Sequence, residues 1–577
     1  MADISSWDLA KVKEDLLDAH RECSLRRLLY GAKWVAELSS AIEVSLDPRS
    51  LAQKACSEDL FRDLDKVNLA TTYFDLKEYE RAAHVLMGTD SPRAYFLYMY
   101  AQFLSDETRR HDGASDSIGH SGPVDNKRLK VLRTELAAKY SQKELDGYGL
   151  YLYGVVLKRL DLTKAAVDIF VEAVNKQPLH WGAWQELALL ITDREMLLSL
   201  SLPAHWVRSL FLAHVYLELQ LHEEALEIYQ TFMDAGFSKS NYLVAQIATA
   251  YHNMRDVDQA VAAFSELEKM DPYRLETMDI YSDLLYVKEM RAELAHLAHR
   301  CCDINKYRVE TCCVIANYYS LRSQHEKAIL YFQRALRLNP HYLSAWTLIG
   351  HEFMEMKNTS AAIQAYRQAL EVNKRDYRAW YGLGQTYEIM KMPFYSLYYY
   401  RQAHILKPND SRMVVALGEC YEKLERLQEA KKCFRKAHTI GDLEGGALYK
   451  LAKLYERLNE SDQAASAYTE YIMETERRGV HSHEEISQAY RYLANYHLSR
   501  RQLDDAYAAA QKCAEFTETR EDAKAILQQI QSLRSQGEGA APVRLDDSTE
   551  SYTAERFRPG EPRTFGRITP VSLKFTP

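Results

Sequence analysis

Small and aromatic residues recur along this chain at a fixed spacing of 34 residues. Frames of this length begin at residues 241, 275, 309, 343, 377, 411 and 445. Frame position 8 is small in all seven, and the residues are Ala248, Ser282, Ala316, Gly350, Gly384, Gly418 and Ala452. Position 20 is small in six frames, and position 24 is aromatic in six, with Phe264, Phe332, Tyr366, Tyr400, Phe434 and Tyr468. A period of this length predicts a stack of similar units.

The residue types indicate what each unit looks like. Two antiparallel helices approach closely only where both side chains are small, which explains positions 8 and 20. Aromatic side chains at position 24 fill the space beside that contact, and proline at position 32 (Pro272, Pro340 and Pro408) helps to end the second helix. One helix pair cannot bury its apolar face alone, so neighbouring pairs must stack. The pattern is that of the tetratricopeptide repeat (TPR), and it predicts an all-α superhelical solenoid of antiparallel helix pairs.

Weaker copies of the pattern lie on both sides of the regular block. Frames beginning at 63, 147, 206 and 487 keep some of the small and aromatic positions, and residues 1–45 show helical periodicity. Residues 105–126 are rich in Asp, Ser, Gly and His, which predicts a flexible loop inside a repeat. Residues 181–205 break the frame, which predicts an irregular pair. Residues 536–577 are rich in proline, which predicts a disordered tail.

Composition and charge exclude several classes of function. The net charge of −8 and the pI of about 6.2 argue against a nucleic-acid partner. We expect no membrane span and no signal peptide, because the sequence lacks an apolar run of the necessary length. The nine cysteines are scattered, which favours a reducing compartment.

The sequence also lacks the local motifs of an enzyme. It has no phosphate-binding loop and no nucleophile elbow, so we predict no catalysis and no cofactor. The pairs Cys301–Cys302 and Cys312–Cys313 do not have a zinc-site spacing, so we interpret them as buried thiols and predict no metal. His481 and His483 are interpreted as solvated loop residues.

Several stretches carry more than the generic repeat. They include LHWGAWQEL at 179–187, DPYRLETMDIYSDLLYVKE at 271–289 and the long stretch LSAWTLIGHEFMEMKNTSAAIQAYRQALEVNKRDYRAWYGLGQTYEIMKMPFYSLYYYRQA at 343–403. In these stretches the chain resembles the family of eighth subunits of the anaphase-promoting complex, or cyclosome. The resemblance covers roughly residues 60–535 and is strongest over 307–424.

The resemblance implies a non-catalytic scaffold in a multisubunit ubiquitin ligase of the cell cycle, found in the nucleus and cytoplasm. It implies a homodimer formed through the N-terminal repeats, here residues 1–240. It also implies a C-terminal superhelix, here residues 241–535, whose groove receives a short arginine-bearing segment of the activator subunit, the C-box. Other TPR subunits and small accessory subunits are further implied partners.

The groove can be located by helical spacing, since positions 2, 5, 9 and 12 of each first helix share one face. This face is polar and mainly acidic, and acidic side chains accept strong hydrogen bonds from arginine. We therefore predict a C-box site at Asn317, Glu352, Tyr381, Gln385 and Glu388. A solvated helix face explains the same residues and stays an open alternative.

Two other functions compete with the scaffold. A chaperone adaptor would carry Lys at position 5 and Asn at position 9 to clamp a carboxylate, and only Arg491 with Asn495 approaches that pair. An enzyme with a TPR arm does not fit, because only a short tail follows residue 535. In that tail, Thr569 and Thr576 each precede a proline and are possible phosphorylation sites.

Overall fold

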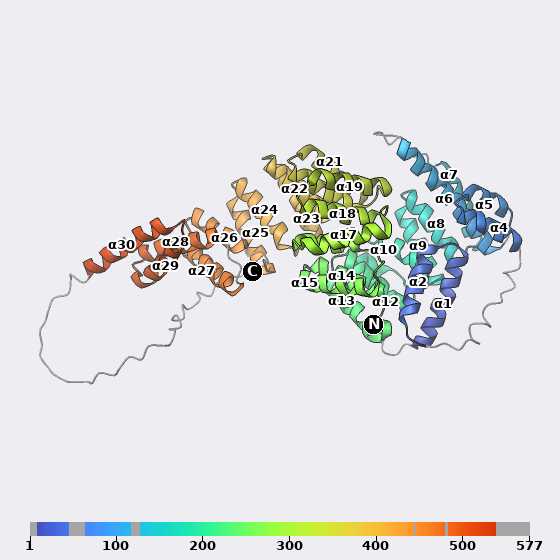
Figure 1. Ribbon diagram of the computed structural model, residues 1–577, viewed down its shortest axis with the longest axis horizontal. Helices are drawn as coiled ribbons and strands as arrows, with labels where there is room; N and C mark the ends of the chain where they lie inside the picture. Colours follow the sequence, from blue (N-terminus) through green and yellow to red (C-terminus); the bar gives the residue numbers. More distant parts are fainter. Residues whose placement is uncertain are drawn as a thin grey trace. The chain divides into compact units, whose positions relative to one another are not determined.

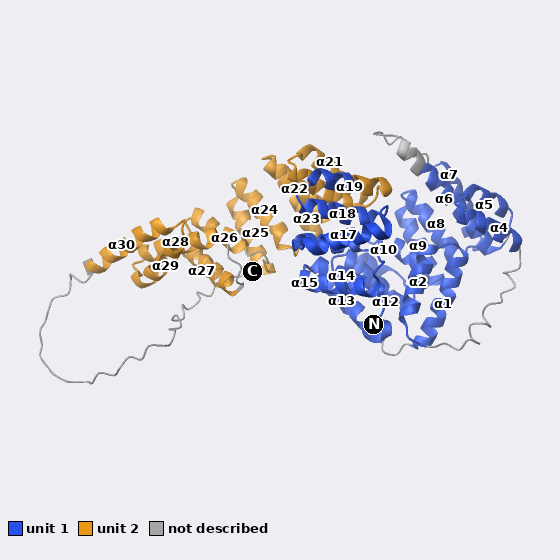
Figure 2. Ribbon diagram, in the orientation of Figure 1, with its two compact units in different colours: residues 1–331 blue, residues 332–577 orange. Residues whose placement is uncertain are grey.

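The computed structural model describes residues 8–44, 64–89, 91–116, 127–442, 446–478 and 483–537. Every regular element within these ranges is a helix (Figure 1). The chain divides into two compact units, unit 1 over residues 1–331 and unit 2 over residues 332–577 (Figure 2). Among the helices in the described ranges, none combines the length and apolar character needed to cross a bilayer. The prediction of an all-α fold built from TPR helix pairs is confirmed.

Unit 1 begins with helices of varied length. They are α1 (Leu9–Leu25), α2 (Leu29–Ala41), α4 (Leu64–Asp75), α5 (Tyr79–Leu86), α6 (Pro92–Asp116), α7 (Lys127–Ser141), α8 (Gly147–Arg159), α9 (Thr163–Lys176), α10 (Trp181–Ala188), α11 (Arg194–Ser199), α12 (Val207–Glu218) and α13 (His222–Phe232). A π-helical segment, η3 (Met233–Phe237), follows. Next come α14 (Asn241–Met254), α15 (Val257–Met270), α16 (Met278–Val287), α17 (Arg291–Asn305) and α18 (Val309–Leu321).

The division between the units falls within α19 (His325–Leu338). Unit 2 continues with α20 (Leu343–Glu355), α21 (Thr359–Val372), α22 (Tyr377–Ile389), α23 (Pro393–Leu406), α24 (Ser411–Lys423), α25 (Leu427–Ile440), α26 (Gly446–Arg457), α27 (Ser461–Arg478), α28 (His483–Ser499), α29 (Leu503–Glu515) and α30 (Arg520–Gly537). Helices α18, α20, α22 and α24 all begin at frame position 1, and their partners α19, α21, α23 and α25 all begin at position 17.

The core of each pair is the close contact between positions 8 and 24. Gly384 on α22 faces Tyr400 on α23, and a Cβ added to Gly384 would lie 2.4 Å from the nearest ring carbons. Gly350 with Tyr366 and Gly418 with Phe434 repeat this contact at 2.5 and 2.6 Å. All the position-20 residues are fully buried beside it, and they are Ala260, Leu294, Ala328, Ala362, Ser396, Ala430 and Ala464. The repeat spacing therefore reflects a steric requirement.

A left-handed residue turns the chain between the two helices of each pair. Frame position 15 has a φ between 54° and 65° in every frame, and the residues are Lys77, Asp161, Gln220, Arg255, Glu289, Ser323, Lys357, Lys391, Glu425, Asn459 and Arg501. At Lys357 the turn is closed by hydrogen bonds from its own N–H to Met354 O (2.9 Å) and from Asn358 N–H to Phe353 O (2.8 Å). Arg27 and Lys143 take the same conformation, so α1–α2 and α7–α8 are joined in the same way.

Residues 1–45, where the sequence shows helical periodicity, contain the helix pair α1–α2, which packs against helices much later in unit 1. Trp34 of α2 stacks on Trp181 of α10, with ring centroids 4.5 Å apart and planes 3° apart. Tyr242 of α14 meets the Trp34 ring edge-on at 5.9 Å. These contacts join residues more than 140 positions apart, which the repeat pattern alone did not predict.

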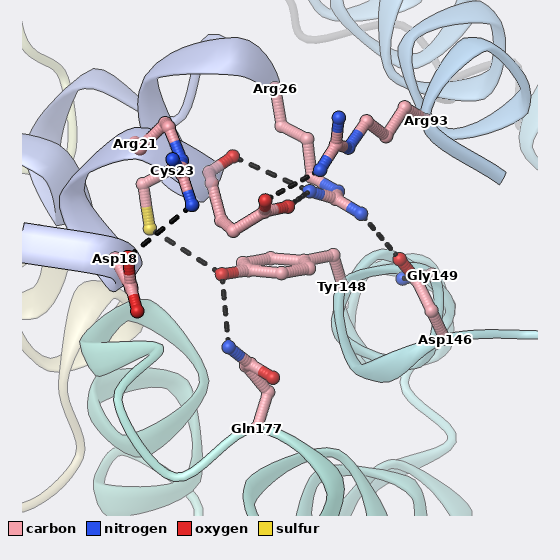
Figure 3. A network of polar contacts seen from close by, with 10 residues as sticks. Asp18, Arg21, Cys23, Arg26, Arg93, Asp146, Tyr148, Gly149 and Gln177 are labelled. Carbon is pink, nitrogen blue, oxygen red and sulfur yellow. Dashed lines mark hydrogen bonds and ion pairs between the residues drawn. The ribbon is translucent and has the colours of Figure 1, made fainter. Parts of the chain in front are cut away.

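A buried arginine fixes this helix pair through a polar network (Figure 3). Arg26 is 5% exposed, and it pairs with Glu22 (Nη1–Oε2, 2.6 Å) and with Asp146 (Nη2–Oδ2, 2.8 Å). Its guanidinium carbon lies 4.2 Å from the centroid of the Tyr148 ring. Burial raises the pKa of the neighbouring Cys23 thiol to about 11, so that thiol stays protonated at neutral pH. The network joins α1 to the N-terminus of α8.

Two boundaries differ from the sequence predictions. Helix α6 continues through Asp116, so the loop predicted over residues 105–126 does not begin at residue 105. Asp106 and Arg110 form an ion pair one turn apart at 3.2 Å, and Ser105 donates a hydrogen bond to Glu80 at 3.2 Å, which explains why this polar segment stays helical. Residues 117–126 and the predicted tail after residue 537 lie outside the described residues.

The second difference concerns residue 240, the predicted boundary between the N-terminal repeats and the C-terminal superhelix. Tyr242 and Leu243 of α14 belong to the hydrophobic cluster that holds the N-terminal helices, while Ala245 and Ala248 belong to the following cluster. One helix therefore contributes to both cores, and the compact units divide at residues 331 and 332 instead.

The close contact at position 8 generates a stability prediction. We expect Gly384→Ala to lower the free energy of unfolding by about 1–3 kcal/mol, because the added methyl group forces the Tyr400 ring to move. Gly446→Ala is a matched control, since a Cβ there meets nothing within 4 Å and alanine favours a helix. Urea unfolding followed by circular dichroism measures both, and equal stability of Gly384→Ala and wild type would contradict the steric account.

The arginine network generates a second prediction. We expect Arg26→Met to cost about 2–3 kcal/mol of unfolding free energy, because Glu22 and Asp146 lose their common partner in a partly buried site. Arg21→Met on the same helix should change stability by less than about 0.5 kcal/mol, because the Arg21 side chain, which pairs with Asp18, is 39% exposed whereas that of Arg26 is 6% exposed. Tryptophan fluorescence during urea unfolding checks both variants, and similar losses for the two would refute the role given to Arg26.

Candidate peptide-binding face and end cavity

Three of the predicted groove residues lie on one face of α22. The ring of Tyr381 is 5.2 Å from the ring of Tyr400 on α23. The Tyr400 hydroxyl donates a hydrogen bond to Glu388 Oε2 at 2.6 Å, and Lys423 Nζ of α24 donates to Glu388 Oε1 at 2.5 Å. Burial, together with the Glu388 carboxylate, raises the pKa of Tyr400 above its usual range. Gln385 lies between them and is half-buried. Tyr400 thus brings Tyr381 and Glu388 together.

The other two predicted residues are buried. Asn317 on α18 is 4% exposed, and its Nδ2 donates to Ser282 Oγ at 2.8 Å and to Asp283 Oδ1 at 2.7 Å. Glu352 on α20 is 6% exposed. Asn317 belongs to unit 1 and Glu352 belongs to unit 2 with the three residues of α22. The Asn317 side chain holds α18 to α16 and Glu352 is buried, and helical spacing revealed neither.

The acidic residues of this face are largely paired within the chain. Glu388 at position 12 pairs with Lys423 at position 13 of the next unit, and Glu422 pairs with Arg457 in the same register. Glu419 pairs with Lys450. The face is therefore less acidic than its carboxylates alone suggest, because each unit places a cation beside the carboxylate of the preceding one.

His351, which also lies on the predicted face, is an uncharged residue at neutral pH. Its Nδ1 lies 2.9 Å from the Tyr366 hydroxyl. Burial, and secondarily the nearby Arg378 cation, lowers the pKa of His351 to about 4. At neutral pH this histidine adds no positive charge to the face.

A cavity lies near the C-terminal end of unit 2, and we call it the end cavity. It has a volume of about 670 Å³ and is bounded by α26, α27, α28 and α30. Its lining residues are Tyr449, Lys453, Glu456, Tyr468, Glu484, Gln488, Arg491, Tyr492, Asn495, Asp522, Ala525, Ile526 and Gln529. Helical spacing places Tyr449, Lys453 and Glu456 among them on the predicted groove face, and the comparison with a carboxylate clamp named Arg491 and Asn495. The repeat pattern could not assign residues of α30 to this lining, because that helix lies beyond the last 34-residue frame.

The end cavity combines aromatic rings with mixed charges. Arg491 pairs with Asp522 at 3.1 Å, so its charge is partly compensated. The Tyr468 hydroxyl donates to Glu456 Oε2 at 3.3 Å, and Lys453 Nζ lies 5.7 Å from the centroid of the Tyr449 ring. Three carboxylates and two cations line the cavity, which leaves a formal charge of −1. Such a lining suits a polar or basic peptide better than an apolar ligand.

The described cysteines are free thiols, and Cys301, Cys312 and Cys313 are fully buried. Burial raises the pKa of Cys301 to about 11, so the interpretation of these residues as packing thiols is consistent with their environment. His438, Glu470 and Glu474 have donor atoms within 4.8 Å of one another, and His438 pairs with Glu470 at 3.4 Å. Thr569, Thr576 and His481 lie outside the described residues.

Comparison with known proteins adds what geometry alone does not give. A family described as anaphase promoting complex subunit 8 / Cdc23 matches residues 11–248. The cell division cycle protein 23 homolog of Homo sapiens is 59% identical over 299 residues, which are 52% of this chain and 50% of that protein. Over these residues the chain is similar to anaphase-promoting complex subunit 8 / Cdc23 proteins.

Further matches agree with this family. Anaphase-promoting complex subunit 8 of Arabidopsis thaliana is 44% identical over 245 residues, which are 42% of each chain. Tetratricopeptide-repeat families match residues 309–342, 411–440 and 446–472, and a TPR family matches 350–390. The chain spans about half the length of the curated relatives that it matches first.

One solved structure resembles the fold of this chain over most of its length. It is a crystal structure of an APC/C hetero-tetramer, Cut9–Hcn1, with a TM-score of 0.55 and 16% sequence identity. The match covers 89% of this chain and 95% of the other. At this identity the likeness shows the shared TPR fold.

Proposed function

We propose that this protein is a non-catalytic scaffold subunit of an anaphase-promoting complex, a multisubunit ubiquitin ligase of the cell cycle. The observation that carries the proposal is the family match over residues 11–248, together with 59% identity to the human cell division cycle protein 23 homolog. A fold of stacked helix pairs supports the role, because such stacks offer extended surfaces to other proteins. Ubiquitin transfer would then be performed by other subunits, in the nucleus and cytoplasm.

The finer proposal is that α22 and its neighbours hold an arginine of the activator C-box. Glu388 supports this assignment, because its carboxylate is already oriented by Tyr400 and Lys423. Tyr381 supports it too, because it also lines a cavity of about 130 Å³ with Arg412, Glu419 and Lys450. An arginine that reaches Glu388 would compete with Lys423, since a planar guanidinium matches a carboxylate better than an ammonium group does.

The N-terminal region is the proposed homodimer interface. The sequence resemblance motivates this assignment for residues 1–240, and the other subunits of the complex, accessory subunits included, are the remaining proposed partners. Exposed apolar side chains in this region, such as Leu29 and Tyr30 at 67% and 84% exposure, are suitable material for such an interface.

Native purification of the tagged full chain from dividing cells tests the scaffold role. We expect the other subunits of the anaphase-promoting complex to copurify, and we expect light scattering of the isolated chain to give the mass of a dimer. Recovery of chaperones in place of ligase subunits would refute the scaffold and favour the adaptor. A monomer in light scattering would refute only the dimer.

Peptide binding tests the proposed C-box site. We expect Glu388→Gln to weaken the binding of an arginine-bearing C-box peptide by about tenfold, because a charge-assisted hydrogen bond becomes a neutral one while the Tyr400 contact can persist. Glu371→Gln is the matched control, since Glu371 is an exposed acid on α21. Calorimetry with the full chain measures both affinities, and unchanged binding in Glu388→Gln would remove this residue from the site.

A further inference from the structure

The end cavity has the chemistry of a site for a basic peptide, and three of its side-chain amides are able to form hydrogen bonds with a ligand. Within the described part of the chain, the side-chain amides of Gln488, Asn495 and Gln529 make no intrachain hydrogen bond. Side-chain amides can pair with both the N–H and the C=O of an extended backbone. The cavity therefore offers three backbone-binding groups, two on α28 and one on α30.

The same cavity can receive a guanidinium group. Glu456 and Glu484 are exposed carboxylates on its wall, whereas Asp522 is already paired with Arg491. The rings of Tyr468 and Tyr492 lie 4.9 Å apart beside them. Aromatic faces next to carboxylates favour arginine, because cation–π contact and a charge-assisted hydrogen bond act on the same group.

A segment of matching chemistry is tethered to the cavity. Residues 552–577 carry Arg556, Arg558, Arg563, Arg567 and Lys574 against Glu555 and Glu561, a net charge of +3. Phe557 and Phe565 alternate with these arginines. Helix α30, which supplies Asp522, Ala525, Ile526 and Gln529 to the cavity wall, ends at Gly537, and residues 538–551 connect it to this segment.

The tether is long enough for the segment to return. The 18 residues 538–555 connect α30 to Arg556, the first arginine of the segment, and a flexible coil of that length has a root-mean-square span of about 25 Å. Helix α30 has 18 residues and is about 27 Å long, so the cavity lies within reach. Tethering at this distance gives a local concentration on the order of millimolar, enough to fill a site of modest affinity.

We propose that the end cavity binds the basic segment 552–577 of the same chain, with an arginine held by Glu456 and Glu484 beside the rings of Tyr468 and Tyr492. This intramolecular contact goes beyond the proposed function and does not rest on it. It makes the cavity a self-occupied site, which another basic peptide could enter only by displacing the segment. A phosphate on Thr569 would subtract about 1.5–2 charges from the segment and weaken the contact.

A labelled peptide of residues 552–577, followed by fluorescence anisotropy, tests the proposal with full-length chains. In the tail-reversed chain, Arg556, Arg558, Arg563 and Arg567 are all replaced by Glu. We expect this chain to bind the peptide about tenfold more tightly than wild type does, because its own segment no longer competes. Adding Glu456→Gln and Glu484→Gln should reduce that binding about tenfold, whereas adding Glu521→Gln, an exposed acid beside the cavity, should leave it unchanged.

Three results would overturn the proposal. Equal peptide binding by the wild-type and tail-reversed chains would mean that the chain's own segment does not occupy the cavity. Unchanged binding after the Glu456 and Glu484 substitutions would move the peptide elsewhere. Loss of binding in a tail-reversed chain with Glu388→Gln would place the peptide on the α22 face instead. The outcome is independent of the C-box measurement, which uses a different peptide and a different control.

Discussion

The close approach of two helices at frame position 8 is the contact on which the rest of this fold depends. At Gly350, Gly384 and Gly418 there is no space for a Cβ, because an aromatic ring from the partner helix occupies it. This approach buries the residue at position 20 completely and fixes how far apart the two helices lie. Each pair then presents the same surface to the next, so the 34-residue register is maintained from α18 to α25.

The same register sets the polar contacts. Because consecutive first helices are equivalent, a carboxylate at position 12 meets the residue at position 13 of the following unit, as in Glu388 with Lys423 and Glu422 with Arg457. Within a unit, the position-24 tyrosine reaches the position-12 glutamate, as in Tyr400 with Glu388 and Tyr468 with Glu456. These carboxylates are oriented before any ligand arrives, which favours recognition of a cation at low entropic cost. They are also partly neutralised, which limits the attraction at long range.

The candidate site shows where sequence reasoning succeeds and where it stops. Helical spacing correctly placed Tyr381, Gln385 and Glu388 on one face of α22, because spacings of four and three residues align on any helix. It could not reveal that Asn317 bonds to Ser282 and Asp283, or that Glu352 is buried, because both depend on the neighbouring helix. The α30 wall of the end cavity was missed for a related reason, since α30 follows no repeat.

The sequence by itself determined the all-α class, the unit length, the small and aromatic packing positions and the resemblance to the subunit 8 family. These are local or periodic properties, and in a repeat protein the same pattern occurs in every unit of the chain. Only the tertiary structure decided that α1 and α2 pack on α10 and α14 through Trp34, Trp181 and Tyr242, and that Arg26 joins α1 to α8. It also decided that residues 105–116 stay helical and that α14 contributes to two cores. Such contacts join residues far apart in the chain and occur once each, so a repeating sequence pattern could not predict them.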